Sequence, residues 1–301
     1  MRRWLRWLGV IVGVLLVGLG GLIAYVWFSS ESMLAERFEL AGRAVEVPTD
    51  AASLAEGKRL ATARGCTECH GLDLGGGALD VGIARFWAPN LTSDPQGAAS
   101  RFTSVEAWEL AIRHGVGAGG RPLLMMPSDE LVRLPDDELG KLIAYARSVP
   151  PVSRPARDHE LTIIARALGV FGLFPLLPVT VTDHALAATP KPPRGPTVAY
   201  GEHLVRMACV GCHGEGLSGG RIPGTPDSIP EVANITPDPE TGLGRWTEEQ
   251  FKTALLTATR PDGTAIDPFM PAKSFAAMDD VELSAIWAYL QSVPARPKGG
   301  H

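Results

Sequence analysis

All four cysteines of this 301-residue chain lie in two segments of one pattern, in which two residues separate the cysteines and a histidine follows. This spacing sets both thiols along one edge of a flat ring and leaves the imidazole beneath the ring centre. It is typical of covalent haem c attachment, where the thiols bond to vinyl groups and the histidine binds iron. We therefore predict two covalently bound haem c groups. Their attachment residues are Cys66, Cys69 and His70 in the first segment and Cys209, Cys212 and His213 in the second.

A cysteine pair has three other common uses, namely a disulfide, half of a zinc site and a redox-active dithiol. A zinc site would need both pairs in one module, whereas Cys66 and Cys209 are 143 positions apart. A redox dithiol does not require a histidine after each second cysteine. The doubled pattern therefore favours haem over these alternatives.

The two cysteine segments are corresponding points of an internal repeat. Residues 51–150 and 197–294 share short matches at a near-constant offset of 143 or 144 positions. An offset that holds over a whole domain indicates a tandem duplication. Besides the cysteine segments, the matches are 90–92 with 234–236, 94–95 with 238–239, 101–103 with 245–247, 126–127 with 270–271, and 148–150 with 292–294.

A methionine followed by proline recurs in both copies and offers a second axial ligand for each iron. Met126 lies 56 positions after His70, and Met270 lies 57 positions after His213. A rigid proline fixes the loop that presents the sulfur, and a thioether ligand is typical of an electron carrier. A lone methionine more often fills a gap in a core. Met126 also has a methionine neighbour, Met125, whereas Met270 has none.

Other polar residues of the repeat have both a chemical and a structural interpretation. Asn90 and Asn234, each two positions before a threonine, could bond haem propionates or the backbone of a turn. Arg101 and Arg245 could pair with propionates or remain solvated. The remaining histidines do not recur between the copies, and we do not expect them to bind iron: His114, His159, His184, His203 and His301.

Apolar periodicity predicts that each copy is mostly helical. The clearest pattern is the last helix of each copy, for which the expected N-caps are Asp136 in the first copy and Asp279 or Asp280 in the second. We expect the apolar stripes of these helices to pack in the core. Further helices are expected at 54–63, 104–114, 199–207 and 248–257. The predicted fold class is all-α, with two tandem helical domains.

The first thirty residues have the composition of a membrane anchor. Leu8–Phe28 contains 21 residues without a charge, which at about 1.5 Å per residue spans a bilayer core of about 30 Å. Three arginines precede it, so we expect a cytoplasmic N-terminus and export of the rest of the chain. A cleaved signal peptide is the alternative, but the apolar stretch is longer than usual for one. The predicted location is a bacterial cytoplasmic membrane, crossed once, with the haem domains on the periplasmic face.

The segment between the two copies combines an apolar part and a Pro-rich part. Leu161–Val181 is apolar but is interrupted by Arg166 and by two prolines, so it is too short to span a membrane. We expect a helix there that packs on one or both haem domains, with a position on the membrane surface as the alternative. The predicted division of the chain is an anchor at 1–30, a juxtamembrane linker at 31–50, haem domains at 51–150 and 197–296, a linker at 151–196 and a tail at 297–301.

The charge balance bears on the choice of partners. The formal net charge is −5, and residues 1–30 contribute three arginines and no acids, so the remainder carries 25 basic and 33 acidic side chains, a balance of −8. This argues against nucleic acid and is compatible with docking to a basic protein face.

Residues 234–242 (NITPDPETG), Trp246 and Met270-Pro271 carry a family resemblance. With the two haem motifs, they make the chain resemble a membrane-anchored di-haem cytochrome c of the class I type. It is similar to the cytochrome c subunits of bacterial membrane-bound alcohol and gluconate dehydrogenases over nearly all of 51–295. The resemblance implies His/Met-ligated haems, a small helical fold around each, and electron passage from a partner dehydrogenase or reductase. Those subunits usually carry three haem motifs, whereas this chain has two.

Two functional hypotheses follow. The leading one is an electron carrier tethered to the outer membrane face, with a dehydrogenase subunit, another cytochrome or an oxidase as its redox partners. The alternative is a di-haem enzyme, such as a peroxidase or a small-substrate oxidase, which needs one open iron site. Because both copies offer a methionine, the sequence favours the carrier. A haem-based sensor has the least support, since no signalling module is evident.

Overall fold

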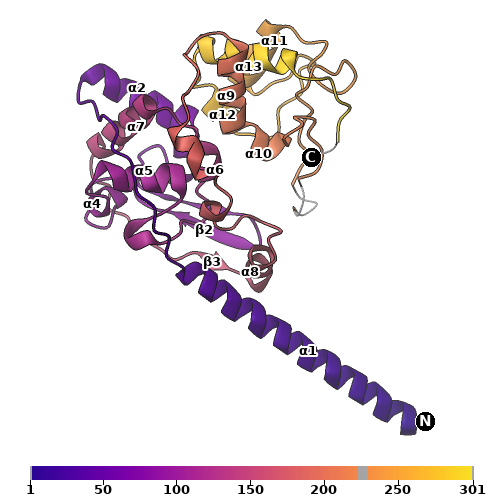
Figure 1. The fold of residues 1–301 in the computed structure, drawn as a ribbon. Coiled ribbons are helices and arrows are strands. Elements are labelled where there is room, and N and C mark those ends of the chain that lie inside the picture. Colours follow the sequence, from indigo (N-terminus) through magenta and orange to yellow (C-terminus); the bar gives the residue numbers. More distant parts are fainter. Residues whose placement is uncertain (1, 223–224, 226–228, 300–301) are drawn as a thin grey trace.

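A computed structural model of the chain describes residues 2–222, 225 and 229–299. It consists of a long N-terminal helix and two largely helical bodies, one for each copy of the repeat (Figure 1). Met1 and the last two residues of the predicted tail, including His301, lie outside the described residues. The mostly helical architecture in two repeats agrees with the predicted fold class.

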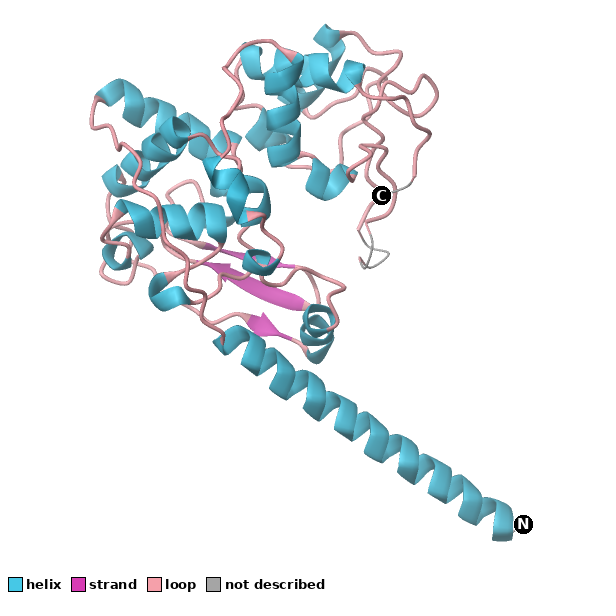
Figure 2. Cartoon of the chain, in the orientation of Figure 1, coloured by secondary structure: helices cyan, strands magenta, loops and turns pink. Residues whose placement is uncertain are grey.

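Helix α1 (Arg2–Ala35) projects away from the rest of the molecule (Figures 1 and 2). It extends beyond the predicted anchor, which ended at residue 30. Its mean hydropathy reaches 2.4, and it is the one helix among the described residues that is long and apolar enough to cross a membrane. Most of its large apolar side chains are exposed, which fits an anchor or a signal sequence.

The first body holds the first cysteine segment, and its main frame is the pair of crossed helices α2 and α7. Gly57 lies at the crossing, where a Cβ atom would collide with the carbonyl oxygen of Lys141. The helices of this body are α2 (Ala51–Ala63), α3 (Cys66–His70), α4 (Ala98–Arg101), α5 (Val105–His114), α6 (Ser128–Leu131) and α7 (Asp136–Ser148), with a 3-10 turn at Ala118–Gly120.

The second body repeats this frame with α9 and α13. Gly201 makes the same close approach, here to the carbonyl of Ala285. Asp279 caps α13 as expected, through a reciprocal capping box with Glu282. The helices of this body are α9 (Val198–Ala208), α10 (Val210–His213), α11 (Glu248–Thr257), α12 (Ala272–Phe275) and α13 (Asp280–Ser292).

The expected N-cap of the corresponding helix in the first body is wrong. Helix α7 begins at Asp136 itself, and Pro135 occupies the cap position without a side-chain bond. The Asp136 carboxylate instead accepts hydrogen bonds from Arg113 at 2.6 Å and from Arg43 at 3.1 Å. Two guanidinium donors therefore take the oxygens that a capping role would need.

A small antiparallel sheet was not expected in a mostly helical body. Its strands are β1 (Gly77–Asp80), β2 (Ala84–Ala88) and β3 (Glu160–Leu161), in the order β1-β2-β3. In β2 the side chains of Ala84 and Phe86 are buried while Arg85 between them is exposed, which is the alternation of a half-buried strand. Phe86 packs on Ala165 and Leu176 of the following linker, so the linker supplies the cover that this sheet requires.

Both predicted linkers pack closely on the first body. The helix expected within Leu161–Val181 is limited to α8 (Ile163–Val170), followed by 3-10 turns at Pro178–Thr180 and His184–Ala188. The juxtamembrane stretch after α1 is also in contact, because Phe38 donates its amide to the Gly120 carbonyl at 2.9 Å. Close approach of the Glu46 carbonyl leaves no room for a Cβ atom at Gly140.

Arg64, which follows α2, joins the two bodies through buried ion pairs. Its guanidinium donates to Glu138 of α7 at 2.9 and 3.0 Å and to Glu282 of α13 at 2.7 Å. Arg59 donates to the same Glu282 at 2.6 Å. The side chains of Arg64 and Glu282 are 1% and 0% exposed. Burial by itself would raise the pKa of Glu282, but the two arginines hold it below its usual value.

This network generates a stability prediction. Replacing Glu282 by Gln removes a buried charge on which two guanidinium groups depend, so we expect a loss of about 3 kcal/mol in the free energy of unfolding. The measurement is guanidinium unfolding of the haem-loaded, full-length protein. Glu240→Gln is the control, because its pair with Arg245 is exposed and should contribute less than about 1 kcal/mol. Equal losses in the two variants would contradict the structural role of the network.

Candidate haem-binding sites

Each cysteine segment folds as a short helix that follows a longer one. In the first copy α3 begins after Gly65, whose φ of 74° is left-handed and turns the chain away from α2. Cys66 and Cys69 are three positions apart and therefore lie on one face of the helix. In the second copy Cys209 ends α9 and directly precedes α10.

Both histidines of the cysteine segments are buried and held in the same way. His70 Nδ1 lies 2.9 Å from the Pro89 carbonyl oxygen, and His213 Nδ1 lies 2.8 Å from that of Ala233. A carbonyl oxygen only accepts, so Nδ1 carries the proton and Nε2 keeps a lone pair. Burial lowers the pKa of His70 and so favours the neutral ring. A neutral imidazole with a free Nε2 is what an iron ligand requires.

The asparagines of the repeat fix the loops that supply these carbonyls. Asn90 directly follows Pro89, and its amide group donates to the Val152 carbonyl at 2.6 Å while its oxygen accepts from Thr92. Asn234 does the same in the second copy, donating to the Arg296 carbonyl at 2.7 Å. The side-chain amides of both asparagines are therefore hydrogen-bonded to other protein groups, which supports the turn interpretation over propionate binding. Arg245 bonds Glu240 at 2.6 Å at the surface.

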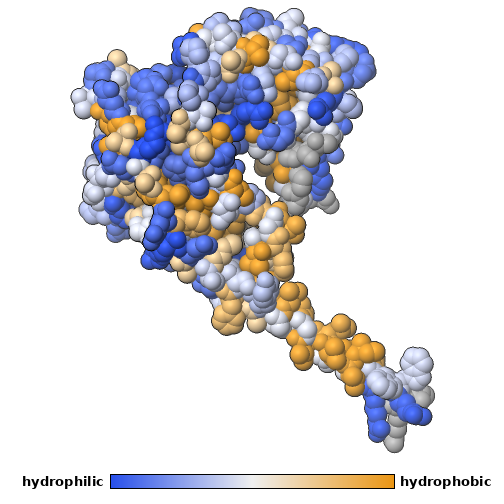
Figure 3. Space-filling view, in the orientation of Figure 1, coloured by the Kyte–Doolittle hydropathy of each residue, from blue (hydrophilic) through white to orange (hydrophobic). Residues whose placement is uncertain are grey.

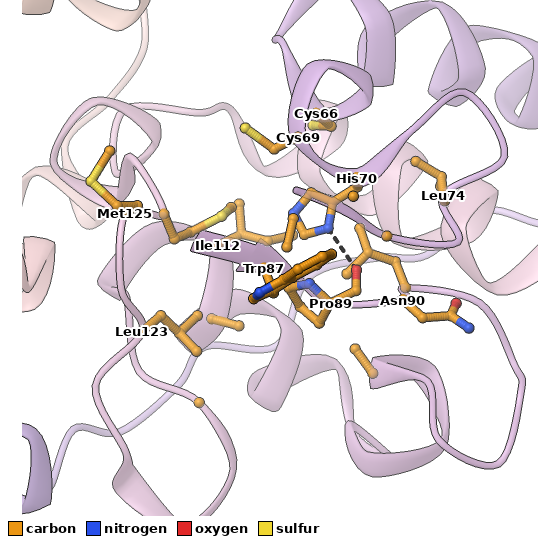
Figure 4. A pocket seen from close by; sticks show the side chains of 18 of the residues that line it. Cys66, Cys69, His70, Leu74, Trp87, Pro89, Asn90, Ile112, Leu123 and Met125 are labelled. Carbon is orange, nitrogen blue, oxygen red and sulfur yellow. Dashed lines mark hydrogen bonds between the residues drawn. The ribbon is translucent and has the colours of Figure 1, made fainter. Parts of the chain in front are cut away.

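A cavity of about 800 Å³ opens beside the first cysteine segment (Figure 4). Cys66, Cys69 and His70 lie together on its wall. The rest of the lining is largely apolar, as a flat hydrophobic cofactor requires. Its apolar lining includes Leu74, Phe86, Trp87, Trp108, Leu131 and Leu142. The donor set, the histidine tautomer and the volume all fit a haem group.

The candidate ligand Met126 and its neighbour Met125 both line this cavity, but they differ in conformation. Met125 has a left-handed backbone with φ of 58°, and its side chain packs beside the cluster of Ala84, Phe86 and Leu176. Figure 4 shows this side chain turned away from His70. Met126 is on the cavity lining together with His70, and its carbonyl oxygen accepts from Ser128 N at 2.7 Å, which tightens the turn at the following proline.

The second copy presents the corresponding residues. Met270 is half-buried against the main core, as are Trp246 and Ile235. Its carbonyl oxygen accepts from Ala272 N at 2.8 Å, the same turn as in the first copy. Leu217 and Leu74, four positions after the two histidines, are buried with left-handed φ values of 56° and 53°. The two sites therefore share backbone geometry as well as residue types.

The cysteine thiols have the properties of attachment sites more than of redox catalysts. Burial raises the pKa of Cys66 to about 11 and that of Cys209 to about 12. A reactive dithiol needs the opposite shift, because the thiolate is the nucleophile. Among the described residues no group of three or more His, Cys, Asp or Glu side chains could hold a metal ion, so the two pairs do not form one four-cysteine zinc site there.

The two sites are in mutual contact, which the sequence analysis missed. Glu130 of α6 accepts a hydrogen bond from the backbone N–H of Gly211, and Ser274 of α12 donates to Glu68 at 2.6 Å. Glu130 and Ser274 occupy corresponding positions of the repeat, as do Gly211 and Glu68. Each cysteine segment thus touches the helix that follows the Met-Pro turn of the other copy. Alignment of the two copies shows that Glu130 corresponds to Ser274 and Glu68 to Gly211. It does not show that each glutamate contacts the other copy.

Comparisons with known proteins agree with this geometry. The family model for cytochrome c matches residues 54–150 and 198–294. The chain is 28% identical over 271 residues to the fructose dehydrogenase cytochrome subunit of Gluconobacter japonicus, covering 82% of this chain and 54% of that protein. It is 27% identical over 292 residues to the alcohol dehydrogenase (quinone) cytochrome c subunit of Gluconobacter oxydans strain 621H, covering 86% and 58%.

A shorter match has higher identity. The gluconate 2-dehydrogenase cytochrome c subunit of Pantoea cypripedii is 35% identical over 97 residues, which is 31% of this chain and 22% of that protein. The chain spans little more than half the length of the relatives that it matches along most of its own length. Two matched domains, each with a buried histidine beside its cysteine pair, place this chain in the cytochrome c family.

Proposed function

We propose that this protein is a di-haem electron carrier on the periplasmic side of the membrane, passing electrons between a dehydrogenase or other respiratory complex and a terminal acceptor. The observation that carries the proposal is the equivalence of the two sites. Each has a buried histidine with Nδ1 on a backbone carbonyl, a cysteine pair beside it and a Met-Pro turn. A di-haem enzyme would need the two sites to differ, with one iron position left open.

The proposed axial ligands are His70 with Met126 and His213 with Met270. Haem c, when bound, supplies a one-electron Fe(III)/Fe(II) couple, whose potential a thioether ligand raises. The protein residues orient that group and exclude water from it. In the first copy buried Trp108, Leu134 and Leu74 supply apolar walls. A rigid, dry site that changes little between oxidation states suits electron transfer.

The contact between the bodies supports transfer between the two sites. The buried core is continuous from Leu60 and Trp108 in the first body to Leu204 and Phe251 in the second. The reciprocal contacts of Glu130 with Gly211 and of Ser274 with Glu68 bring both cysteine segments to this interface. Since each attached cofactor must lie against its own cysteine pair, the two would approach one another here.

The names of the relatives suggest the partner. Several are cytochrome subunits of dehydrogenases that act on fructose, alcohols or gluconate. We propose a membrane-bound dehydrogenase as the electron donor for this chain and α1 as the element that holds it at the same membrane. The acidic balance outside α1 suits docking to a basic protein face.

Haem content and ligand access test the carrier proposal. We expect two haem c groups in each full-length chain and one after joint substitution of Cys209 and Cys212 by Ser, measured from the haemochrome spectrum. Because both irons are fully ligated, carbon monoxide should bind slowly or not at all after reduction. A single haem in the native chain would refute the two-site model. Rapid carbon monoxide binding by the native protein would favour the enzyme alternative.

Substitution of the methionines tests the sixth ligands. Met126→Ala and Met270→Ala should each remove about half of the near-infrared charge-transfer band of Met-ligated ferric haem, since one of two equivalent sites is changed. Each variant should also gain carbon monoxide binding at one iron. Met125→Ala is the matched control and should keep the full band. Loss of the band in the Met125 variant, with retention in the Met126 variant, would reverse the assignment.

Glu130 gives a pH prediction for the interface. Burial, with the nearby charge of Asp129, raises its pKa from 4.5 to about 7. The folded state therefore holds a proton that the unfolded chain releases near pH 4.5. This stabilisation is complete below about pH 4.5 and is lost as pH rises through about 7. We expect the denaturant midpoint to fall over that range and Glu130→Gln to flatten the fall, whereas the exposed control Glu240→Gln should leave it unchanged. An identical slope in the Glu130 variant would contradict this role.

A further inference from the structure

The linker helix α8 packs against the end of α1 that adjoins the first body. Phe171, just after α8, places its ring 6.4 Å from that of Tyr25. Arg166 places its guanidinium 4.2 Å from the ring centre of Trp27. The same group donates to Ser30 and Glu31 of α1, both at 2.7 Å. These contacts fix the level along α1 at which the linker segment lies.

That level falls inside the uncharged part of α1. The apolar stretch ends at Phe28, two serines follow, and Glu31 is the first charged residue after it. Tyr25 precedes Glu31 by six positions, which is about 9 Å along a helix. Phe171, in contact with Tyr25, is therefore on the membrane side of the first charge. If α1 crosses the bilayer with its uncharged residues in hydrocarbon, the turn after α8 must lie at the membrane boundary.

The surface of this segment has the composition of a membrane-facing one. Ile164, Phe171 and Leu173 are 57%, 52% and 66% exposed. Figure 3 shows apolar surface that continues from α1 onto the adjoining part of the first body, where α8 lies. The only charged residue of 161–181 is Arg166, and its side chain is 11% exposed and paired with Glu31. No uncompensated charge of the segment would therefore enter the bilayer.

We propose that Ile164, Phe171 and Leu173 insert into the lipid interface beside α1 and form a second membrane contact. This rests on the proposed membrane anchoring by α1. The partner that covers this apolar surface is the bilayer itself, because the surface is continuous with the membrane-spanning helix and lies beside the end of that helix's apolar stretch. Anchoring by α1 alone would leave the orientation of the haem domains relative to the membrane unrestricted. Two contacts fix the first body against the membrane, with the second body beyond it (Figure 1).

The test measures where single side chains lie in the full-length, haem-loaded protein. Spin labels are placed on cysteines introduced at Ile164, Leu173, Val14 and Leu256, in nanodiscs of phosphatidylethanolamine and phosphatidylglycerol. Oxygen partitions into lipid and a charged nickel chelate stays in water. The Val14 position marks the anchor, and Leu256 of α11 is the control because it is an exposed apolar residue on the second body. Two haems per labelled chain show that each variant is folded.

We expect labels at Ile164 and Leu173 to be more accessible to oxygen than to the nickel chelate, as at Val14, and the Leu256 label to show the reverse. Water-like accessibility at 164 and 173 with a lipid-like Val14 would overturn the proposal while leaving the anchor intact. Low accessibility to both reagents at 164 and 173 would show burial against protein and would also overturn it. A water-like Val14 would overturn the anchor and this inference together.

Discussion

The arrangement depends on one requirement, that a buried imidazole keep Nε2 available while its Nδ1 proton is bonded. An unbonded buried N–H costs free energy, so each histidine needs one acceptor at a fixed place. Pro89 and Ala233 provide it with a backbone carbonyl. The loop that carries this carbonyl has no helix of its own to hold it. It is tied instead by the neighbouring asparagine to the chain that follows the last helix of the body. The orientation of the ligand therefore depends on the frame of crossed helices, and each copy solves the problem in the same way.

Much of this could be predicted from the sequence because the chemistry is local or repeated. The spacing of the cysteines and the histidine is enough to predict haem attachment, and the constant offset locates the Met-Pro turns and the main helices. The helix at Glu248–Thr257 has the predicted bounds, and Asp279 caps α13 as expected. Local patterns were less reliable where a distant partner competes for a side chain. Asp136 has the right position for a cap, but Arg113 and Arg43 bind its carboxylate. The small sheet depends on linker residues far along the chain that pack on Phe86. The residue pattern of β2 alone does not predict this packing.

The interface between the bodies shows why a duplicated sequence need not make two independent domains. Glu130 meets a glycine, and its counterpart Ser274 meets a glutamate. Each contact pairs one carboxylate with one hydrogen-bond donor. Carboxylates on both sides would repel each other. Without any carboxylate, the backbone N–H of Gly211 or the hydroxyl of Ser274 would have only a weaker acceptor. At each of these two positions of the repeat, one copy therefore has a glutamate and the other has a small residue. The residues form a matched set only when both bodies are present, so the interface is a property of the pair.

A difference of one residue explains why only the first copy supplies an arginine that reaches both Glu138 and Glu282, which are corresponding residues of the two copies. Gly57 and Gly201 occupy the same helix crossing at an offset of 144, whereas Cys66 and Cys209 correspond at an offset of 143. The first copy therefore has one more residue between the crossing and the cysteine. Helix α9 runs through Ala208 directly into Cys209, but α2 stops at Ala63 and the chain turns at Gly65 through a left-handed conformation. The turn frees Arg64 from helical geometry, so that its side chain reaches Glu138 and Glu282 at once. Removing this residue would restore the symmetry of the repeat, and we expect it to break the ion pair between Arg64 and Glu282. The contacts of Arg59 with Glu282, of Glu130 with Gly211 and of Ser274 with Glu68 would still join the bodies.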